Sequence, residues 1–209
     1  QGGIISGDDY IPNFQGVIDA VNEYFYEQIK RTPTGWYRKK PKIQIIHLMT
    51  RPDDVREQIS QKSLKQLQRL GFDYKPMVNK VYEGEVPKDF CRRPDMISDK
   101  PDYKGEEGVG TLTARHYGCF TSHLKALMEI DEENYDYTLI FEADAFIYST
   151  LRDFADMIYK ACFISERDNV SYVSFANNPS WNRWGVDSNF SKTDYNQDWA
   201  HCYLIPNRE

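Results

Sequence analysis

The sequence lacks a long hydrophobic run, an excess of basic residues and any internal repeat. No apolar stretch approaches the roughly 18 residues that a membrane-spanning helix needs. The formal net charge of −6 argues against a nucleic-acid surface, which is normally basic. With 40% hydrophobic and 28% charged residues, the composition is typical of a soluble globular domain. We therefore expect neither a nucleic-acid partner nor a transmembrane segment, and leave peripheral membrane association open.

Cysteine is scarce and dispersed. The four residues, Cys91, Cys119, Cys162 and Cys202, contain no CxxC pair, so zinc-ribbon spacing is absent and a disulfide framework is not expected. Reduced, mostly buried thiols suit a cytoplasmic location. The chain also lacks an initiator methionine and a signal peptide, and it ends on a strand-like run, "HCYLIPNRE". We interpret it as a fragment cut at both ends, so the missing targeting segment proves nothing.

Hydrophobic periodicity predicts an N-terminal segment of one helix and then a βαβ unit. Residues 1–35 are expected to hold the helix, and residues 36–41 a basic, proline-bounded linker. A buried strand over 42–49 is followed by a helix that Thr50 can cap, with Pro52 in its first turn. Its predicted apolar face comprises Val55, Ile59, Leu64, Leu67 and Leu70. A strand over 72–82 completes a unit that implies a parallel sheet with a right-handed crossover.

The second half repeats the alternation of helix and strand. After a long polar loop (83–110), a helix is predicted over 111–130, with an apolar side formed by Tyr117, Phe120, Leu124, Leu127 and Ile130. A strand over 135–141, a helix over 151–164, a strand over 170–176, a polar loop over 177–199 and a strand over 201–206 follow. Residues 42–209 are thus expected to form one α/β domain, a mostly parallel sheet flanked by helices.

Glu142 and Asp144 directly follow the buried strand over 135–141. Like charges this close repel, and burying them is costly unless a cation compensates. Because alternate residues of an extended chain point the same way, both carboxylates can face one ion, and such oxygen ligands suit Mg²⁺ or Mn²⁺. A solvated strand end without metal is the alternative.

The context of this pair resembles a known family. "HYGCFTSHLKAL" followed by "YTLIFEADAFI" is similar to the helix start and the strand ending in Glu-Asp-Asp of glycosyltransferase family 25, the lipopolysaccharide and collagen sugar transferases. Gly118, Cys119, Ser122, His123, Glu142 and Asp144 match, whereas Ala143 replaces the middle acid. "IIHLMTRPDDVREQ", "GFDYKPMVNKVYEG" and "WAHCYLI" resemble further family segments, so the similarity spans about 42–205.

The resemblance implies a GT-A (Rossmann-like) fold that transfers a sugar from a nucleotide-sugar, such as a UDP-sugar, to a hydroxyl of a glycan acceptor. Thr50, Arg51 and Arg56 would lie near the nucleotide, together with Ser122 and His123 of the matched helix. Glu142 and Asp144 would hold Mn²⁺ or Mg²⁺ on the diphosphate.

An inverting transfer also needs a base on the acceptor hydroxyl. Asp187, Asp194 and Asp198 lie in the polar loop, and Asp198 is preferred because a strand follows it. His201 is a candidate late metal ligand, although a core histidine is the alternative, and His123 is alternatively a structural histidine.

The first 35 residues resemble another family. "GGIISGDDY" followed by "GVIDAVNEYF" is similar to the closing part of macrocin-type SAM-dependent O-methyltransferases, with Asp8 and Asp9 matching its paired aspartates. This implies a fused polypeptide that glycosylates and methylates a glycan; a capped amphipathic helix is the alternative.

Two other functions remain open for residues 42–209. The domain could be a non-catalytic carbohydrate- or partner-binding module attached to a methyltransferase, or a metal-dependent phosphohydrolase that uses the same acids.

Overall fold

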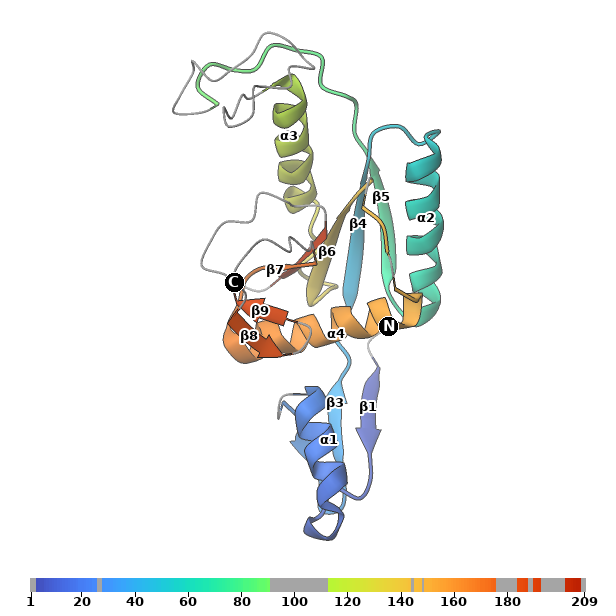
Figure 1. Ribbon diagram of the computed structural model, residues 1–209, viewed down its shortest axis with the longest axis vertical. Helices are drawn as coiled ribbons and strands as arrows, with labels where there is room; N and C mark the ends of the chain where they lie inside the picture. Colours follow the sequence, from blue (N-terminus) through green and yellow to red (C-terminus); the bar gives the residue numbers. More distant parts are fainter. Residues whose placement is uncertain are drawn as a thin grey trace.

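The protein is built around a mixed sheet of five strands. The computed structural model describes residues 3–25, 28–90, 113–143, 145–147, 149–175, 184–187, 190–192 and 202–207 (Figure 1). The sheet order is β5-β4-β6-β10-β7, with strands Asp73–Val78, Ile43–Met49, Tyr137–Glu142, Cys202–Pro206 and Val173–Ser174. β4 pairs in parallel with β5 and β6, whereas β10 is antiparallel to both of its neighbours. The predicted α/β class is confirmed, and the sheet is mixed.

Helices cover both faces of this sheet (Figure 1). The predicted helices are present as α2 (Val55–Leu67, extended by the 3-10 turn Gln68–Leu70), α3 (Ala114–Met128) and α4 (Leu151–Asp168). α2 and α4 contribute Leu64, Leu67, Phe154 and Ile158 to one large buried cluster. α3 contributes Ala126 to a smaller cluster with Ile46, Leu48 and Ile140.

The β4 sequence explains this two-sided burial. All seven of its residues are buried, and alternate side chains go to opposite faces. Ile43 and Ile45 join the cluster on the α2 and α4 side, whereas Ile46 and Leu48 join the cluster on the α3 side. A strand buried on both faces requires the continuous apolar run that the sequence shows.

The start of α2 differs from the prediction. The N-cap is Asp54, not Thr50, and its carboxylate accepts a hydrogen bond from the Arg56 N–H at 2.8 Å. Val55 and Ile59 are 69% and 50% exposed, so the first half of the predicted apolar face is wrong. Glu57 and Ser60 occupy the inner side there instead. They lie beside strand ends, where unpaired backbone groups need polar partners.

The apolar side predicted for α3 is also largely exposed. Phe120, Leu124 and Leu127 are all more than 40% exposed, and Thr113 caps the helix through a reciprocal contact with His116. The side of α3 that faces the sheet presents Ala126 to the core. Because a small residue meets the sheet, α3 buries little apolar surface of its own.

The N-terminal segment forms a small unit of its own, drawn below the main sheet in Figure 1. Strands β1 (Ile4–Gly7), β2 (Lys30–Arg31) and β3 (Trp36–Lys39) form an antiparallel sheet in the order β1-β3-β2, and α1 (Gln15–Phe25) follows a 3-10 turn (Pro12–Phe14). The predicted helix is confirmed, but the segment 36–41 contains β3 rather than only a linker. Phe25 contacts Phe163 of α4, with ring centroids 5.2 Å apart, and so joins the unit to the domain.

The region predicted as a polar loop between 177 and 199 contains a hairpin in its described part. β8 (Trp184–Asp187) pairs antiparallel with β9 (Phe190–Lys192), and a register shift separates Gly185 from Asp187. The prediction of a continuous loop is therefore wrong at this point. Across the helices that the structure describes, none is long and apolar enough to cross a membrane.

Two glycines allow a test of how closely α3 is packed. A Cβ at Gly118 would lie 2.9 Å from Tyr82 Cβ, whereas a Cβ at Gly16 in α1 would meet nothing within 4 Å. We expect Gly118→Ala to lower the free energy of unfolding by about 1–3 kcal/mol through overpacking. Gly16→Ala should raise it by up to about 1 kcal/mol through helix propensity. Urea denaturation of both variants measures the difference, and equal shifts would contradict the packing of α3 against Tyr82.

Candidate active site

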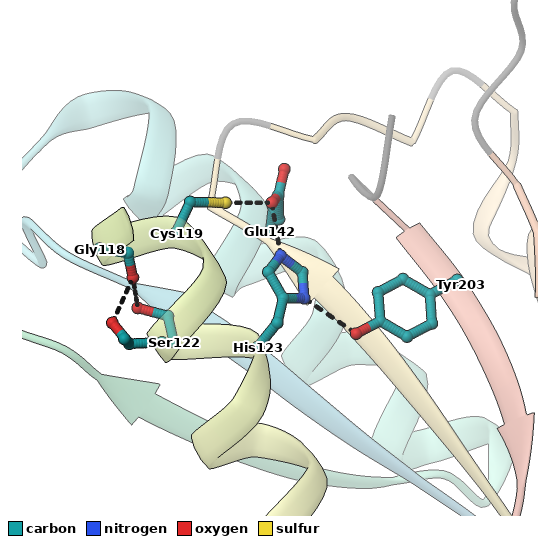
Figure 2. Close-up of polar contacts among 7 residues, drawn as sticks. Gly118, Cys119, Ser122, His123, Glu142 and Tyr203 are labelled. Carbon is teal, nitrogen blue, oxygen red and sulfur yellow. Dashed lines mark hydrogen bonds and ion pairs between the residues drawn. The ribbon is translucent and has the colours of Figure 1, made fainter. Parts of the chain in front are cut away.

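Four polar side chains converge at the carboxyl end of β6 (Figure 2). His123 Nε2 lies 2.7 Å from Glu142 Oε1, and Cys119 Sγ donates to the same oxygen at 3.4 Å. On its other side, His123 Nδ1 lies 2.9 Å from the Tyr203 hydroxyl, and the two rings are stacked with centroids 5.6 Å apart. Two residues of α3 thus meet at the carboxylate that ends β6, and His123 links this carboxylate to Tyr203 of β10.

Local geometry brings these residues together. Cys119 and His123 are four residues apart on α3, so they share one face of the helix. Glu142 alternates with Ile140, which points to the α3 side of the sheet, and Tyr203 points to the same side from β10. The side chains of His123 and Glu142 are only 13% and 16% exposed. The pair is therefore a partly desolvated contact rather than a surface ion pair.

The Tyr203 hydroxyl keeps its proton. Burial raises its pKa well above the usual range, and Tyr172, Glu142 and Cys119 raise it further. A protonated hydroxyl can either donate to or accept from His123 Nδ1. Tyr203 can therefore pair with either tautomer of His123: it accepts from Nδ1–H when the proton is on Nδ1, and it donates to Nδ1 when the proton is on Nε2.

Glu57 fixes the turn that follows β4. Its carboxylate accepts hydrogen bonds from the backbone N–H groups of Thr50 and Arg51 at 3.1 and 2.8 Å, and from the Thr50 hydroxyl at 2.9 Å. In the parallel register, Leu48 of β4 pairs with Glu142. The turn over Thr50 and Arg51 therefore lies at the same sheet edge as Glu142, with its backbone held in place.

Ser60 of α2 anchors the backbone on both sides of residue 144. Its hydroxyl contacts the carbonyl oxygens of Ala143 and Ala145, at 3.2 and 2.9 Å. The Ala145 N–H also donates to the Glu142 carbonyl at 3.1 Å. Ser60 thus ties the chain after β6 to α2. Glu57, the preceding buried residue of the same helix, holds the turn after β4.

His47 lies in β4, three residues before Thr50. It is fully buried, Nδ1 is 3.0 Å from the Tyr74 hydroxyl, and Nε2 has no hydrogen-bond partner among the residues that the structure describes. Burial lowers the pKa of His47 to about 4, although the nearby Glu57 carboxylate acts in the opposite direction. His47 is therefore neutral at physiological pH.

The structure brings some of the predicted residues together and separates others. His123 and Glu142 are in contact, and Thr50 and Arg51 lie at the neighbouring strand end. The Ser122 hydroxyl donates to the Gly118 carbonyl of its own helix at 2.8 Å, and Arg56 is exposed on α2.

The remaining predicted residues stay untested. Asp187 ends β8, and nothing is described of its side chain. Asp144, Asp194, Asp198 and His201 lie outside the described residues.

Sequence reasoning missed roles for three residues at this site: Cys119, Tyr203 and Glu57. The four-residue spacing of Cys119 and His123 was a visible signal for one shared helix face. Tyr203 is brought to the site only by strand pairing, and Glu57 lies in a helix turn where an apolar inner face was predicted. No local pattern distinguishes either from a surface residue.

A concave region lies at the opposite end of β6 from Glu142, between the N-terminal unit and the domain, and Tyr137 at the start of β6 lines it. It has a volume of about 650 Å³ and is lined by residues of both signs of charge, among them Lys30, Lys39, Asp136 and Glu166. Arg38 pairs with Glu166 there and stacks on Phe163 at 4.4 Å. None of the predicted site residues lines it.

A comparison with known protein families identifies the family of the chain. Residues 40–182, more than half of the 209-residue chain, match the family model described as glycosyltransferase family 25 (LPS biosynthesis protein). The chain therefore belongs to glycosyltransferase family 25. No curated protein and no solved structure gives a match to it.

The neutral, buried state of His47 makes stability depend on pH. The unfolded chain takes up a proton near the ordinary pKa of 6.5, whereas the folded chain does so only near 4. Below pH 6.5 the unfolded state therefore binds more protons, and stability falls as the pH drops toward 4. The full effect is about 3 kcal/mol.

The variant His47→Gln isolates this contribution. Chemical denaturation at pH 7.5 and at pH 4.5 should show a smaller loss of unfolding free energy for the variant than for the native chain. Identical losses in the two proteins would show that His47 is not buried in its neutral form.

Proposed function

We propose that this chain transfers a sugar from a nucleotide-sugar to a hydroxyl of a lipopolysaccharide-like glycan. One observation carries the proposal. The chain belongs to glycosyltransferase family 25, and Glu142, one of its two predicted cation ligands at this strand end, ends β6 beside the fixed turn after β4. In α/β sheets, ligands bind beyond the carboxyl ends of the strands.

The turn over Thr50 and Arg51 is proposed to receive the nucleotide. Glu57 holds both backbone N–H groups, so the turn is shaped before any ligand arrives. The exposed side chains of Arg51 and Arg56 supply positive charge near this edge, which suits a diphosphate. A turn held in advance costs less ordering on binding than a mobile loop. A UDP-sugar remains the proposed donor, and GT-A the proposed fold.

A divalent cation, Mn²⁺ or Mg²⁺, is proposed to bind at Glu142. Glu142 supplies a hard oxygen, and the adjacent His123 and Cys119 supply nitrogen and sulfur. Glu142, Asp144 and His201 are the proposed ligands. When bound, the cation would neutralise charge that develops on the leaving diphosphate.

The acceptor side needs a base for an inverting transfer. Asp198, with Asp194 and Asp187 as alternatives, is proposed to accept the proton of the attacking hydroxyl. Ser60 holds the backbone next to the proposed cation site, because its hydroxyl contacts the carbonyl oxygens of Ala143 and Ala145.

The methyltransferase resemblance also stays a proposal. β1 ends at Gly7, Asp8 and Asp9 follow, and α1 comes after a short turn, which is the order that the resemblance implies. A covalent fusion would let one polypeptide glycosylate and methylate the same glycan.

Calorimetric titration with UDP-sugars, with and without Mn²⁺, tests the proposed function. We expect binding that strengthens with Mn²⁺ and weakens at least about tenfold in Asp144→Asn, since one charged contact is worth about 1.5–3 kcal/mol. The exposed acid Glu133 gives the matched control, and Glu133→Gln should bind as the native chain does.

Three outcomes would count against sugar transfer. Binding that ignores Mn²⁺ and Asp144 contradicts the proposed donor site. Binding of glycan alone, with neither sugar hydrolysis nor transfer, would favour a non-catalytic module. Release of phosphate from simple esters would favour a phosphohydrolase.

A further inference from the structure

We propose that Cys119, His123 and Glu142 form an open, three-ligand site for a thiophilic divalent transition metal of the Zn²⁺ or Co²⁺ type. The inference shares Glu142 with the proposed cation site but gives it other ligands and another class of metal, and it rests on the proposed function only for what the ion does there. The ligand set itself differs from the paired carboxylates expected from the sequence, because a thiol and an imidazole replace one acid.

The spacing of the three donor atoms suits such an ion. One sulfur, one nitrogen and one oxygen all lie within 4.8 Å of one another. A tetrahedral Zn²⁺ has bonds of about 2.0–2.3 Å, which places neighbouring ligand atoms about 3.5 Å apart. Cys119 Sγ and Glu142 Oε1 already stand at 3.4 Å, and His123 Nε2 and Oε1 at 2.7 Å. To reach this spacing, His123 Nε2 and Glu142 Oε1 must move apart.

Rigid elements carry the three ligands. Cys119 and His123 project from consecutive turns of α3, and Glu142 ends a strand whose preceding residues are buried (Figure 2). Gly118 beside Cys119 lets α3 approach Tyr82 closely. A site on a helix and a strand holds its geometry better than one on loops.

Tyr203 acts as the orienting partner of His123. Without metal, the Tyr203 hydroxyl can donate to Nδ1 while Nε2–H donates to Glu142, in line with the observed distances. With metal, the imidazole proton resides on Nδ1 and points at the Tyr203 oxygen, which leaves the Nε2 lone pair for the ion. Metal-bound histidines almost always have such a second partner. The thiol proton of Cys119 leaves to solvent when sulfur coordinates.

The chemistry of the set predicts metal preference and an available position. Thiolate and imidazole ligands bind Zn²⁺ and Co²⁺ strongly and bind Mg²⁺ only weakly. Three protein ligands leave the fourth tetrahedral position for water or a ligand oxygen, as in catalytic zinc sites. The competing explanation is that the three side chains only hydrogen-bond α3 to β6.

Absorption spectroscopy during titration of the chelator-treated full chain with Co²⁺ distinguishes the two. We expect a thiolate-to-cobalt charge-transfer band with one Co²⁺ per chain. The band should vanish in Cys119→Ser and persist in Cys91→Ser, which removes a thiol elsewhere in the sequence. His123→Gln and Glu142→Gln should weaken Co²⁺ binding at least tenfold, whereas Lys125→Gln on the exposed side of α3 should not. Zn²⁺ should bleach the band, and excess Mg²⁺ should leave it.

A second measurement uses the native chain alone. Zn²⁺ should slow alkylation of Cys119 by iodoacetamide at least tenfold, read by peptide mass spectrometry, so a variant that fails to fold does not decide the question. No charge-transfer band, or a band unchanged in Cys119→Ser, would overturn the inference. If Cys119→Ser still transfers sugar, the proposed function holds and the metal site is not needed for it. If the chain binds Co²⁺ through Cys119 but transfers no sugar, the metal site holds and the proposed function fails.

Discussion

The contact between His123 and Glu142 is the constraint on which the candidate site depends. It joins α3, which buries little apolar surface of its own, to the carboxyl end of β6. Both side chains are largely shielded from solvent, so the loss of either would leave the other poorly compensated. Because Tyr203 holds the second nitrogen of His123, the same contact also ties the antiparallel strand β10 to the site. Three elements distant in sequence thereby define one edge of the sheet.

Polar residues on the inner side of α2 serve the same edge. An amphipathic helix is expected to bury apolar residues there, yet Glu57 and Ser60 take these positions and meet the backbone after β4 and β6. Such buried polar groups are stable only when hydrogen-bonded, and both are. The first half of α2 thus gives up hydrophobic burial and fixes two turns, whereas Leu64 and Leu67 in its second half hold the helix to the core.

Periodicity predicted the elements that are buried in regular patterns. β4, β6 and α4 follow from apolar runs or spacing, and Gly71 ends the segment after α2 in the left-handed conformation that glycine favours. It failed where a helix faces polar groups, as at Val55 and Ile59, and where short strands pair across a turn, as at Trp36–Lys39.

The site itself was predictable only in part. Glu142 was found from its place after a buried strand, and His123 and Cys119 belong to the matched family motif. The structure adds Tyr203 and the contact of Cys119 with Glu142, because strand pairing and helix docking cannot be read from local sequence. The position of Tyr203 depends on β10 lying beside β6, although more than fifty residues separate the two strands.

The central claim is that a nucleotide and its cation bind where β4, β6 and α3 meet. A crystal structure of the chain with UDP and Mn²⁺, with anomalous scattering recorded for manganese, tests it most directly. The account predicts an anomalous peak within bonding distance of Glu142 and a diphosphate beside the turn over Thr50 and Arg51. A nucleotide bound instead in the cavity next to Lys30 and Lys39, or a manganese ion remote from Glu142, would contradict it.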